Sequence, residues 1–195
     1  HSRFMPPSIW LRLFSLRLIY DCMDDLWAFD AISARDALTE PHLLQRADLI
    51  LSSAVHLAGI LERRGAPSTR LHLVRNALKQ QWLEVDAVRR PPNPNGPWVA
   101  LYFGSVDTWF DFPAVLHALD ALPDLNIHLV GPAQVPIPFH PRLLHKGAVP
   151  HSELLTHSRV AHALIMPFHL TELIRSVDPV KMYEYVALGL PIVAR

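Results

Sequence analysis

Lys181 and Glu184 form the residue pair whose types and spacing are best suited to chemistry, because they stand three positions apart and share one face if their segment is helical. Asp178 is a typical N-cap and Pro179 suits the first helical position, so a helix over 178–188 would place Lys181 in its first turn. The amide groups and the positive dipole end at the start of that helix, together with the Lys181 ammonium, then form an anion site.

Glu184 adds a second kind of recognition. At a rise of 1.5 Å per residue, Glu184 lies on the order of 8–9 Å from the helix start, which is roughly the span from a pyrophosphate to the hydroxyls of its ribose. A carboxylate there can accept hydrogen bonds from both hydroxyls of a vicinal diol. The pattern therefore favours a nucleoside diphosphate, although a capped surface helix with one Lys–Glu pair explains the same residues without any ligand.

The elements that must position this helix alternate regularly along the chain. Short apolar runs, typical of buried parallel strands, alternate with segments of helical periodicity, which predicts an α/β fold made of parallel β–α units. The predicted strands are Leu18–Cys22, Asp48–Leu51, Leu71–Val74, Trp98–Phe103, Asn126–Val130, Leu143–Lys146, His162–Met166 and Pro191–Ala194. The predicted helices are Pro41–Arg46, Ala54–Arg64, Trp109–Ala121, Ser152–Val160 and Asp178–Leu188.

A proline-rich segment divides the chain. Four of the seven residues from 91 to 97 are proline, which excludes a helix or a central strand there and indicates a stiff linker. We therefore expect a first domain over residues 1–80, a linker over 81–97 and a second domain over 98–195. Each domain is expected to hold part of a doubly wound parallel sheet, and both sheets are expected to be incomplete.

The composition excludes several classes of protein. The 195 residues include 18 basic and 18 acidic side chains, and this absence of net charge argues against a nucleic-acid partner. The single cysteine, Cys22, rules out an internal disulfide and fits a reducing compartment. No apolar run is long enough to predict a membrane-spanning helix. The apolar and basic stretch 10–18 could lie on a membrane surface, or it could be a core helix that leads into the first strand.

Several motifs occur in the order and spacing of one enzyme family. The segment 180–194, VKMYEYVALGLPIVA, resembles the C-terminal signature of GT-B glycosyltransferases, especially of bacterial enzymes that make cell-surface polysaccharides. Weaker matches to the nucleotide-sugar domain of this family are VALYFGS at 99–105, WFD at 109–111, NIHLVGP at 126–132, HKGAVPHSEL at 145–154 and ALIMPF at 163–168. Matches to the latter half of its acceptor domain are YDCMDD at 20–25, RADLILSS at 46–53 and VRNA at 74–77.

The resemblance implies a GT-B fold of two Rossmann-like doubly wound sheets, with a nucleotide sugar bound in the cleft between them. Glu184 would hold the ribose, and Lys181 with the helix N-terminus, including Asp178, would hold the pyrophosphate. Gly104 would let the backbone approach the donor. The backbone at Val149 and Pro150 would contact the base.

Two departures from the family pattern affect this expectation. Many relatives carry a glutamate eight positions before the ribose glutamate, where this chain has Ser176. The nearest upstream glutamate is Glu172, which is therefore only a candidate for contact with the sugar. The loop 105–111 contains no basic residue, although many relatives hold the β-phosphate with bases there, and more weight consequently falls on Lys181.

The implied activity is transfer of a sugar from a nucleoside diphosphate to a surface polysaccharide or glycolipid acceptor, without a metal or another cofactor; the catalytic residues are unknown. The implied partners are the nucleotide-sugar donor and a saccharide or lipid-linked acceptor. The enzyme would be cytoplasmic, with peripheral contact at the inner membrane face. We expect these 195 residues to be the middle of a longer protein and to be inactive alone. A non-catalytic transferase-like scaffold subunit and a nucleotide-sugar epimerase remain open alternatives.

Acidic and histidine side chains suggest weaker alternatives. Asp21, Asp24 and Asp25 could form a cation site, but three acids after a strand are more often caps and solvated groups, and Asp24 or Asp25 could instead face the cleft. The twelve histidines show no zinc-binding spacing. His151 and His169 fall near the proposed donor loops, where either could contact phosphate or sugar.

Overall fold

The computed structural model describes residues 17–28, 34–82 and 96–195. The chain divides into two compact units. The first comprises the residues up to Asn76 together with Arg175–Asp178, and the second comprises Ala77–Ile174 together with Pro179–Arg195. The linker predicted over 81–97 and the apolar stretch 10–18 lie for the most part outside the described residues.

The first unit is built on a parallel three-stranded sheet in the order β1–β2–β3. Buried and less buried side chains alternate along β1 and β2, as expected when one face of each strand packs on a core. That core joins Tyr20 and Ile50 of the sheet to Leu57 and Leu61 of a helix. The elements are β1 (Ile19–Cys22), η1 (Leu26–Ala28), α2 (Ala34–Arg46), β2 (Leu49–Ser52), α3 (Val55–Arg63), η2 (Ser68–Arg70) and β3 (Leu71–Leu73).

Helix α2 is longer than the sequence predicts. It begins at Ala34, and Pro41, the predicted first residue, lies inside it. A proline inside a helix removes one backbone hydrogen bond and favours a helix start at that point. Here the helix buries Leu43 and Leu44 in the core of the first unit, and this packing stabilises more helix than local propensity indicates.

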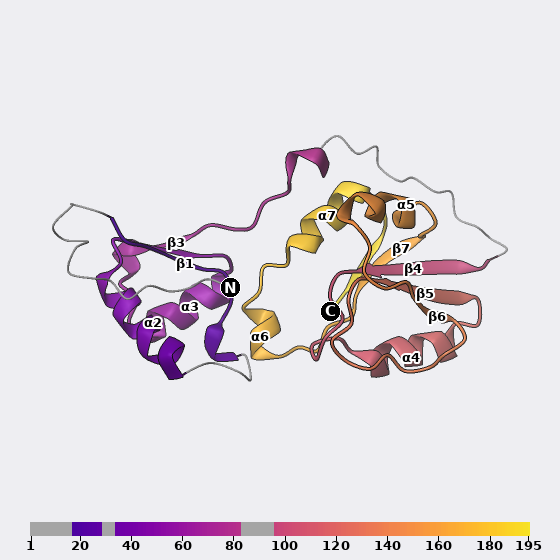
Figure 1. The fold of residues 1–195 in the computed structure, drawn as a ribbon, viewed down its shortest axis with the longest axis horizontal. Helices are drawn as coiled ribbons and strands as arrows, with labels where there is room; N and C mark the ends of the chain where they lie inside the picture. Colours follow the sequence, from indigo (N-terminus) through magenta and orange to yellow (C-terminus); the bar gives the residue numbers. More distant parts are fainter. Residues whose placement is uncertain (1–16, 29–33, 83–95) are drawn as a thin grey trace. The chain divides into compact units, whose positions relative to one another are not determined.

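The second unit is built on a parallel five-stranded sheet in the order β6–β5–β4–β7–β8 (Figure 1). Strand β4 is central, because it pairs with β5 on one side and with β7 on the other. The strands are β4 (Trp98–Phe103), β5 (Leu125–Val130), β6 (Leu143–His145), β7 (Ala163–Met166) and β8 (Ile192–Ala194). The helices are η3 (Gln80–Trp82), α4 (Phe112–Ala121), η4 (His151–Glu153), α5 (Leu154–Ser158), α6 (Glu172–Arg175) and α7 (Val180–Leu188).

Helices cover both faces of this sheet. Tyr102 of β4 packs in one core with Val115 and Leu119 of α4. Phe103, the next residue, packs in a second core with Tyr185 of α7. Figure 1 shows α4 on one side of the strands and α5 and α7 on the other. The sheet is therefore doubly wound, and the two parallel sheets confirm the predicted α/β class with Rossmann-like units.

All eight predicted strands are present, but other helices besides α2 also differ from prediction. Helix α4 begins at Phe112 instead of the predicted Trp109. The segment Ser152–Val160 forms η4 followed by the shorter α5, and α6 was not predicted. Helix α7 begins at Val180 with Pro179 as its N-cap residue, so the prediction that Asp178 caps this helix is wrong. None of the helices in the described ranges is long and apolar enough to cross a membrane.

Candidate functional site

The candidate site of the second unit lies where the strand order reverses. Strand β4 leads through α4 to β5 on one side, whereas β7 lies on the other side, so the carboxyl ends of β4 and β7 flank the topological switch point. Ligands of doubly wound sheets bind at such points. Gly104 follows β4 directly, and Phe168 follows β7 after one residue.

Gly104 is needed at the end of β4 for two reasons. Its φ of +138° lies in a region that side chains disfavour, and a Cβ atom there would be 2.5 Å from Lys181 Nζ. The absence of a side chain thus lets the Lys181 ammonium lie against the backbone at the strand end. The predicted approach of the donor to the Gly104 backbone is a separate matter and stays a prediction.

The Lys181 ammonium has aromatic and hydroxyl neighbours. Lys181 Nζ donates to Tyr102 Oη at 2.8 Å, and it lies 4.7 Å and 5.1 Å from the ring centroids of Tyr102 and Phe168. Burial lowers the pKa of Lys181 from 10.5 to about 8, and the nearby Glu184 carboxylate counteracts part of that effect. Within the described part of the chain, no carboxylate forms an ion pair with this ammonium. An anion at the switch point would supply the missing counter-charge.

Tyr102 is a fixed partner for Lys181. Its hydroxyl donates to the Ser105 carbonyl at 2.6 Å, and its ring packs edge-to-face on Phe110. Burial raises the pKa of Tyr102, so the phenol stays neutral at physiological pH. Tyr102 can therefore orient the ammonium, but it cannot neutralise it.

Glu184 is buried, with 8% of its surface exposed. Its Oε1 lies 2.9 Å from His151 Nε2. The next residue, Tyr185, fixes α7 to the sheet, because its hydroxyl accepts from the Phe103 amide at 3.2 Å and donates to the Ile165 carbonyl at 3.1 Å. Tyr185 therefore ties the helix that carries Lys181 and Glu184 to strands on both sides of the switch point.

The segment predicted to contact the base, Val149 and Pro150, directly precedes His151, which contacts the Glu184 carboxylate. Val149 is half-buried and packs against the core that contains Tyr185, whereas Pro150 is exposed and precedes η4. Trp82 contacts His151 edge-on at 5.4 Å between ring centroids and stacks on Phe103 at 6.3 Å. Trp82 Nε1 is buried and has no hydrogen-bond partner among the described residues.

Two further residues that the resemblance assigns to the donor, Asp178 and Glu172, have other surroundings. Asp178 belongs to the first unit, where its carboxylate accepts from Arg75 Nη1 at 3.3 Å and from the Asn76 amide at 2.8 Å. These bonds explain why Asp178 does not cap α7. Glu172 is exposed at the start of α6. A role for either residue in donor binding stays a prediction.

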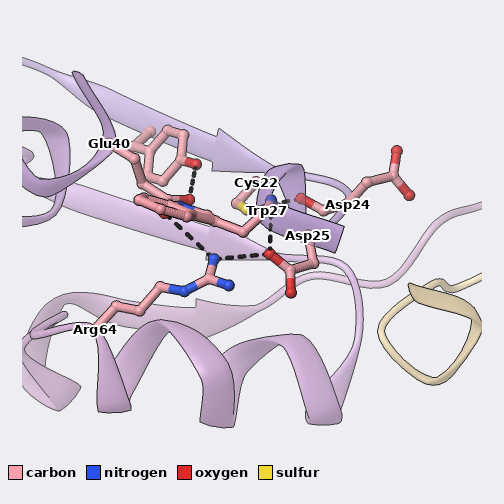
Figure 2. A network of polar contacts seen from close by, with 7 residues as sticks. Cys22, Asp24, Asp25, Trp27, Glu40 and Arg64 are labelled. Carbon is pink, nitrogen blue, oxygen red and sulfur yellow. Dashed lines mark hydrogen bonds and ion pairs between the residues drawn. The ribbon is translucent and has the colours of Figure 1, made fainter. Parts of the chain in front are cut away.

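The acids that follow β1 belong to a different kind of cluster. Arg64 Nη1 lies 2.7 Å from Asp25 Oδ1 and 3.3 Å from Glu40 Oε2, and the guanidinium lies over the Trp27 ring (Figure 2). Asp25 Oδ1 also accepts from the Trp27 amide at 3.1 Å. Asp25 is therefore an internal ion-pair partner and turn cap, and the expectation that it could face a cleft is wrong. Figure 2 shows the Asp24 carboxylate pointing away from this network.

The remaining predicted ligands do not gather. The described residues contain no group of three or more histidine, cysteine or acidic side chains that could hold a metal ion. Asp111 caps α4, its Oδ1 accepting from the Ala114 amide at 2.9 Å. His169 Nδ1 lies 3.6 Å from Asp111 Oδ2, which also pairs with Arg195 at 2.6 Å.

Burial raises the pKa of the Cys22 thiol to about 11, so this cysteine is a poor nucleophile.

Sequence reasoning missed the aromatic surroundings of the site. Tyr102 and Phe168 fall inside quoted motifs, but nothing in their spacing indicates that both lie beside Lys181. His151 was singled out as a contact for phosphate or sugar, and the structure places it on the Glu184 carboxylate. Trp82 had no sequence signal other than its size and apolar character.

Comparisons with known proteins agree with this arrangement. No protein-family model matches the chain. The chain is 26% identical over 199 aligned residues to the Bacillus subtilis (strain 168) protein named "Putative teichuronic acid biosynthesis glycosyltransferase TuaH", covering 91% of this chain and 50% of that protein. The chain thus spans about half the length of the curated relative it matches.

Solved structures show the same fold. HepE of Anabaena, solved with UDP and glucose, matches 94% of this chain and 54% of its own with a TM-score of 0.69 and 14% identity. Sucrose-phosphate synthase of Thermosynechococcus elongatus matches 95% and 52% with a TM-score of 0.65 and 15% identity. The lipopolysaccharide outer core galactosyltransferase WaaB matches 95% and 58% with a TM-score of 0.58 and 17% identity. The resemblance to GT-B glycosyltransferases is thereby confirmed.

Proposed function

We propose that the second unit binds the nucleoside diphosphate of a sugar donor and that the protein to which this chain belongs is a glycosyltransferase. The observation that carries the proposal is the Lys181 ammonium, which lies at the switch point without an ion-pair partner among the described residues. A diphosphate would occupy the space beside Lys181 and Gly104. The ribose would then face the Glu184 carboxylate on the next turn of α7.

The proposed chemistry is electrostatic. A departing nucleoside diphosphate carries the negative charge that develops when the bond to the sugar breaks, and a preorganised ammonium stabilises that charge most in a water-poor site. Lys181 is held by Tyr102 before any ligand arrives, so little reorganisation is needed. We propose that no metal ion takes part in this stabilisation, which predicts that a chelator leaves nucleotide affinity unchanged.

The names of similar proteins indicate which donor and acceptor to test first. HepE has been solved with UDP and with UDP-glucose, so a uridine nucleotide is the first candidate for the donor. The names of TuaH and WaaB refer to teichuronic acid and to lipopolysaccharide. We therefore propose a saccharide or lipid-linked acceptor of the cell envelope, and action in the cytoplasm at the inner membrane face.

Calorimetric titration of the 195-residue chain with UDP, GDP and ADP tests the donor site. Binding of one of these nucleotides should be lost or weakened at least tenfold in Lys181→Ala and in Glu184→Ala, because each substitution removes one charged hydrogen-bonding group. Lys146→Ala, at an exposed lysine after β6, is the matched control and should bind as the unsubstituted chain does.

Two results would contradict the proposal. Equal binding by Lys181→Ala and the unsubstituted chain would show that the ammonium does not contact the diphosphate. A chain that binds none of the three nucleotides would instead favour a transferase-like scaffold subunit. That alternative draws on Ser176, which replaces the expected glutamate and is fully buried, so it cannot contact a sugar as it lies.

A further inference from the structure

His151 makes the only hydrogen bond to the Glu184 carboxylate that the described part of the chain resolves, and the proposed function gives His151 no role. The bond joins His151 Nε2 to Glu184 Oε1 at 2.9 Å, within the normal range for a bond to an ionised acceptor. The His151 side chain is 41% exposed and that of Glu184 is 11% exposed. The pair therefore lies at the boundary between the core and solvent, where a ligand can reach it.

The imidazole has a rigid neighbour on its inner side. Trp82 is 3% exposed, and its ring meets that of His151 edge-on with an interplanar angle of 84°. Trp82 is itself stacked on Phe103 of the central strand at an interplanar angle of 13°. The packed indole limits how far the imidazole can move and so helps to fix the direction of its Nε2–H bond.

We propose that His151 is a positioning residue that orients the Glu184 carboxylate for the two hydroxyls of a ribose, so that the site distinguishes ribonucleotides from nucleotides that lack those hydroxyls. This inference rests on the proposed function. An ionised carboxylate offers about four lone-pair positions. The imidazole occupies one of them on Oε1, which fixes the plane of the carboxylate and leaves Oε2 and the second position on Oε1 to accept from a vicinal diol.

The tautomer follows from this role. Because a carboxylate can only accept, Nε2 of His151 must carry the hydrogen. Without that donor, the end of the Glu184 side chain can rotate, and a bound ribose must then order it at an entropic cost. Removing the His151 donor should therefore lower the affinity only for ligands that carry the ribose hydroxyls.

The test compares two nucleotides by calorimetry, UDP and 2′,3′-dideoxyuridine 5′-diphosphate. The unsubstituted chain should bind UDP at least tenfold more tightly, because the dideoxy compound offers no hydroxyl to the lone-pair positions of the buried Glu184 carboxylate that His151 leaves open. His151→Phe keeps an aromatic edge beside Trp82 but has no N–H group, and its preference for UDP should fall to about threefold or less. His151→Gln, which retains an N–H donor, should keep most of the preference.

Matched controls separate positioning from folding. His117→Phe, at an exposed histidine on α4, should leave both affinities unchanged. The pair His151→Phe and Glu184→Gln should show little further loss beyond Glu184→Gln alone, since His151 acts through that carboxylate. Far-ultraviolet circular dichroism and the melting temperature show whether each variant folds. If His151→Phe does not fold, the milder His151→Asn, whose shorter side chain withdraws the donor, replaces it.

The outcomes are distinguishable. An equal loss of affinity for both nucleotides in His151→Phe would overturn the positioning role, because it would place the imidazole against the base or the phosphates. An unchanged preference for UDP would overturn it as well. Binding of both nucleotides with equal affinity by the unsubstituted chain would refute the ribose role of Glu184 and with it that of His151. A complete absence of nucleotide binding would overturn the proposed function itself.

Discussion

Each of the two units contains a cationic side chain that is largely shielded from water, Arg64 in the first and Lys181 in the second, and the surroundings of these two cations differ. Arg64 in the first unit is paired with the carboxylates of Asp25 and Glu40. Lys181 in the second unit is hydrogen-bonded to a neutral phenol and lies over two aromatic rings. Charges that compensate one another inside a protein stabilise one structure, whereas a buried charge without a partner reduces stability and is available to a ligand.

The first unit's cluster is closed in the sense that its charges are paired with one another. Glu40 is 2% exposed, and its two oxygens accept from the Tyr20 hydroxyl at 2.9 Å and from the Trp27 indole. Arg64 spans from Glu40 to Asp25 (Figure 2). The network therefore joins β1, the turn after it, α2 and the end of α3. Its purpose is structural, and we expect it to tolerate no single deletion.

The largest effect is expected for Arg64→Met. The substitution leaves Asp25 and Glu40 buried without their cation, which should lower the free energy of unfolding of the first unit by about 3–5 kcal/mol. Urea denaturation followed by circular dichroism measures this loss. Arg63→Met, at the exposed neighbouring position on α3, is the control and should change stability by less than about 0.5 kcal/mol. Similar losses in the two variants would show that the network is not a closed structural cluster.

Replacing Lys181 by methionine is expected to change the free energy of unfolding in the opposite direction. Burial lowers the pKa of Lys181 to about 8, so the folded state at neutral pH holds an ammonium that would be more stable in water. Lys181→Met should therefore raise the free energy of unfolding by about 2 kcal/mol at pH 7, after allowance for the lost bond to Tyr102. The variant should at the same time bind no UDP. A destabilised Lys181→Met chain would contradict the contrast between the two clusters.

Some features of the two units can be predicted from local sequence, whereas the ion pairs of Arg64 cannot. Strand β4 has the bounds that the sequence predicts, because a continuous apolar run with a following glycine is a local signal. The face shared by Lys181 and Glu184 is equally local. The ion pair between Asp25 and Arg64, in contrast, joins residues 39 positions apart whose types fit many other arrangements. Its formation depends on where the turn after β1 meets the end of α3.

The candidate site likewise combines features that follow from local spacing with contacts between residues distant in the sequence. The sequence predicts an anion site at α7 with a carboxylate one turn later, and both features follow from spacing of three to four residues. The contact of Lys181 with Tyr102 spans 79 positions, and that of His151 with Glu184 spans 33. These contacts require the strand order, which no local pattern specifies. The predicted N-cap at Asp178 fails for the same reason, since Asn76 and Arg75 take its carboxylate.

The pH dependence of nucleotide binding should report on the charge of Lys181, which has no ion-pair partner among the described residues. The folded-state pKa of about 8 lies below the ordinary 10.5, so Lys181 loses its proton as the pH rises through about 8. The affinity for UDP should consequently fall roughly tenfold between pH 7 and pH 9, because the terminal phosphate of UDP loses its last proton at about pH 6 and keeps a constant charge over this range. Lys181→Arg should bind UDP more weakly, because a planar guanidinium replaces the compact ammonium. Its affinity for UDP should not depend on pH in this range, since the guanidinium stays charged. A flat profile for the unsubstituted chain would contradict the assignment.

The smallest expected effect compares two buried tyrosines, one from each cluster. Tyr20 donates to the Glu40 carboxylate, and Tyr102 accepts from the Lys181 ammonium and donates to the Ser105 carbonyl. Tyr20→Phe and Tyr102→Phe should each lower the free energy of unfolding by about 1–2 kcal/mol at pH 7, because each leaves a charged group with one bond fewer. Urea denaturation at several pH values measures both losses.

The two losses should separate as the pH rises. Lys181 can release its proton above about pH 8, so the ammonium that needed Tyr102 no longer exists there and the loss in Tyr102→Phe should shrink. The cation next to Tyr20 and Glu40 is an arginine, a side chain that stays charged in proteins, so the loss in Tyr20→Phe should stay constant from pH 6 to pH 9. Parallel curves for the two variants would mean that Lys181 is compensated as fully as Arg64. The second unit would then lack the uncompensated charge from which its donor site is inferred.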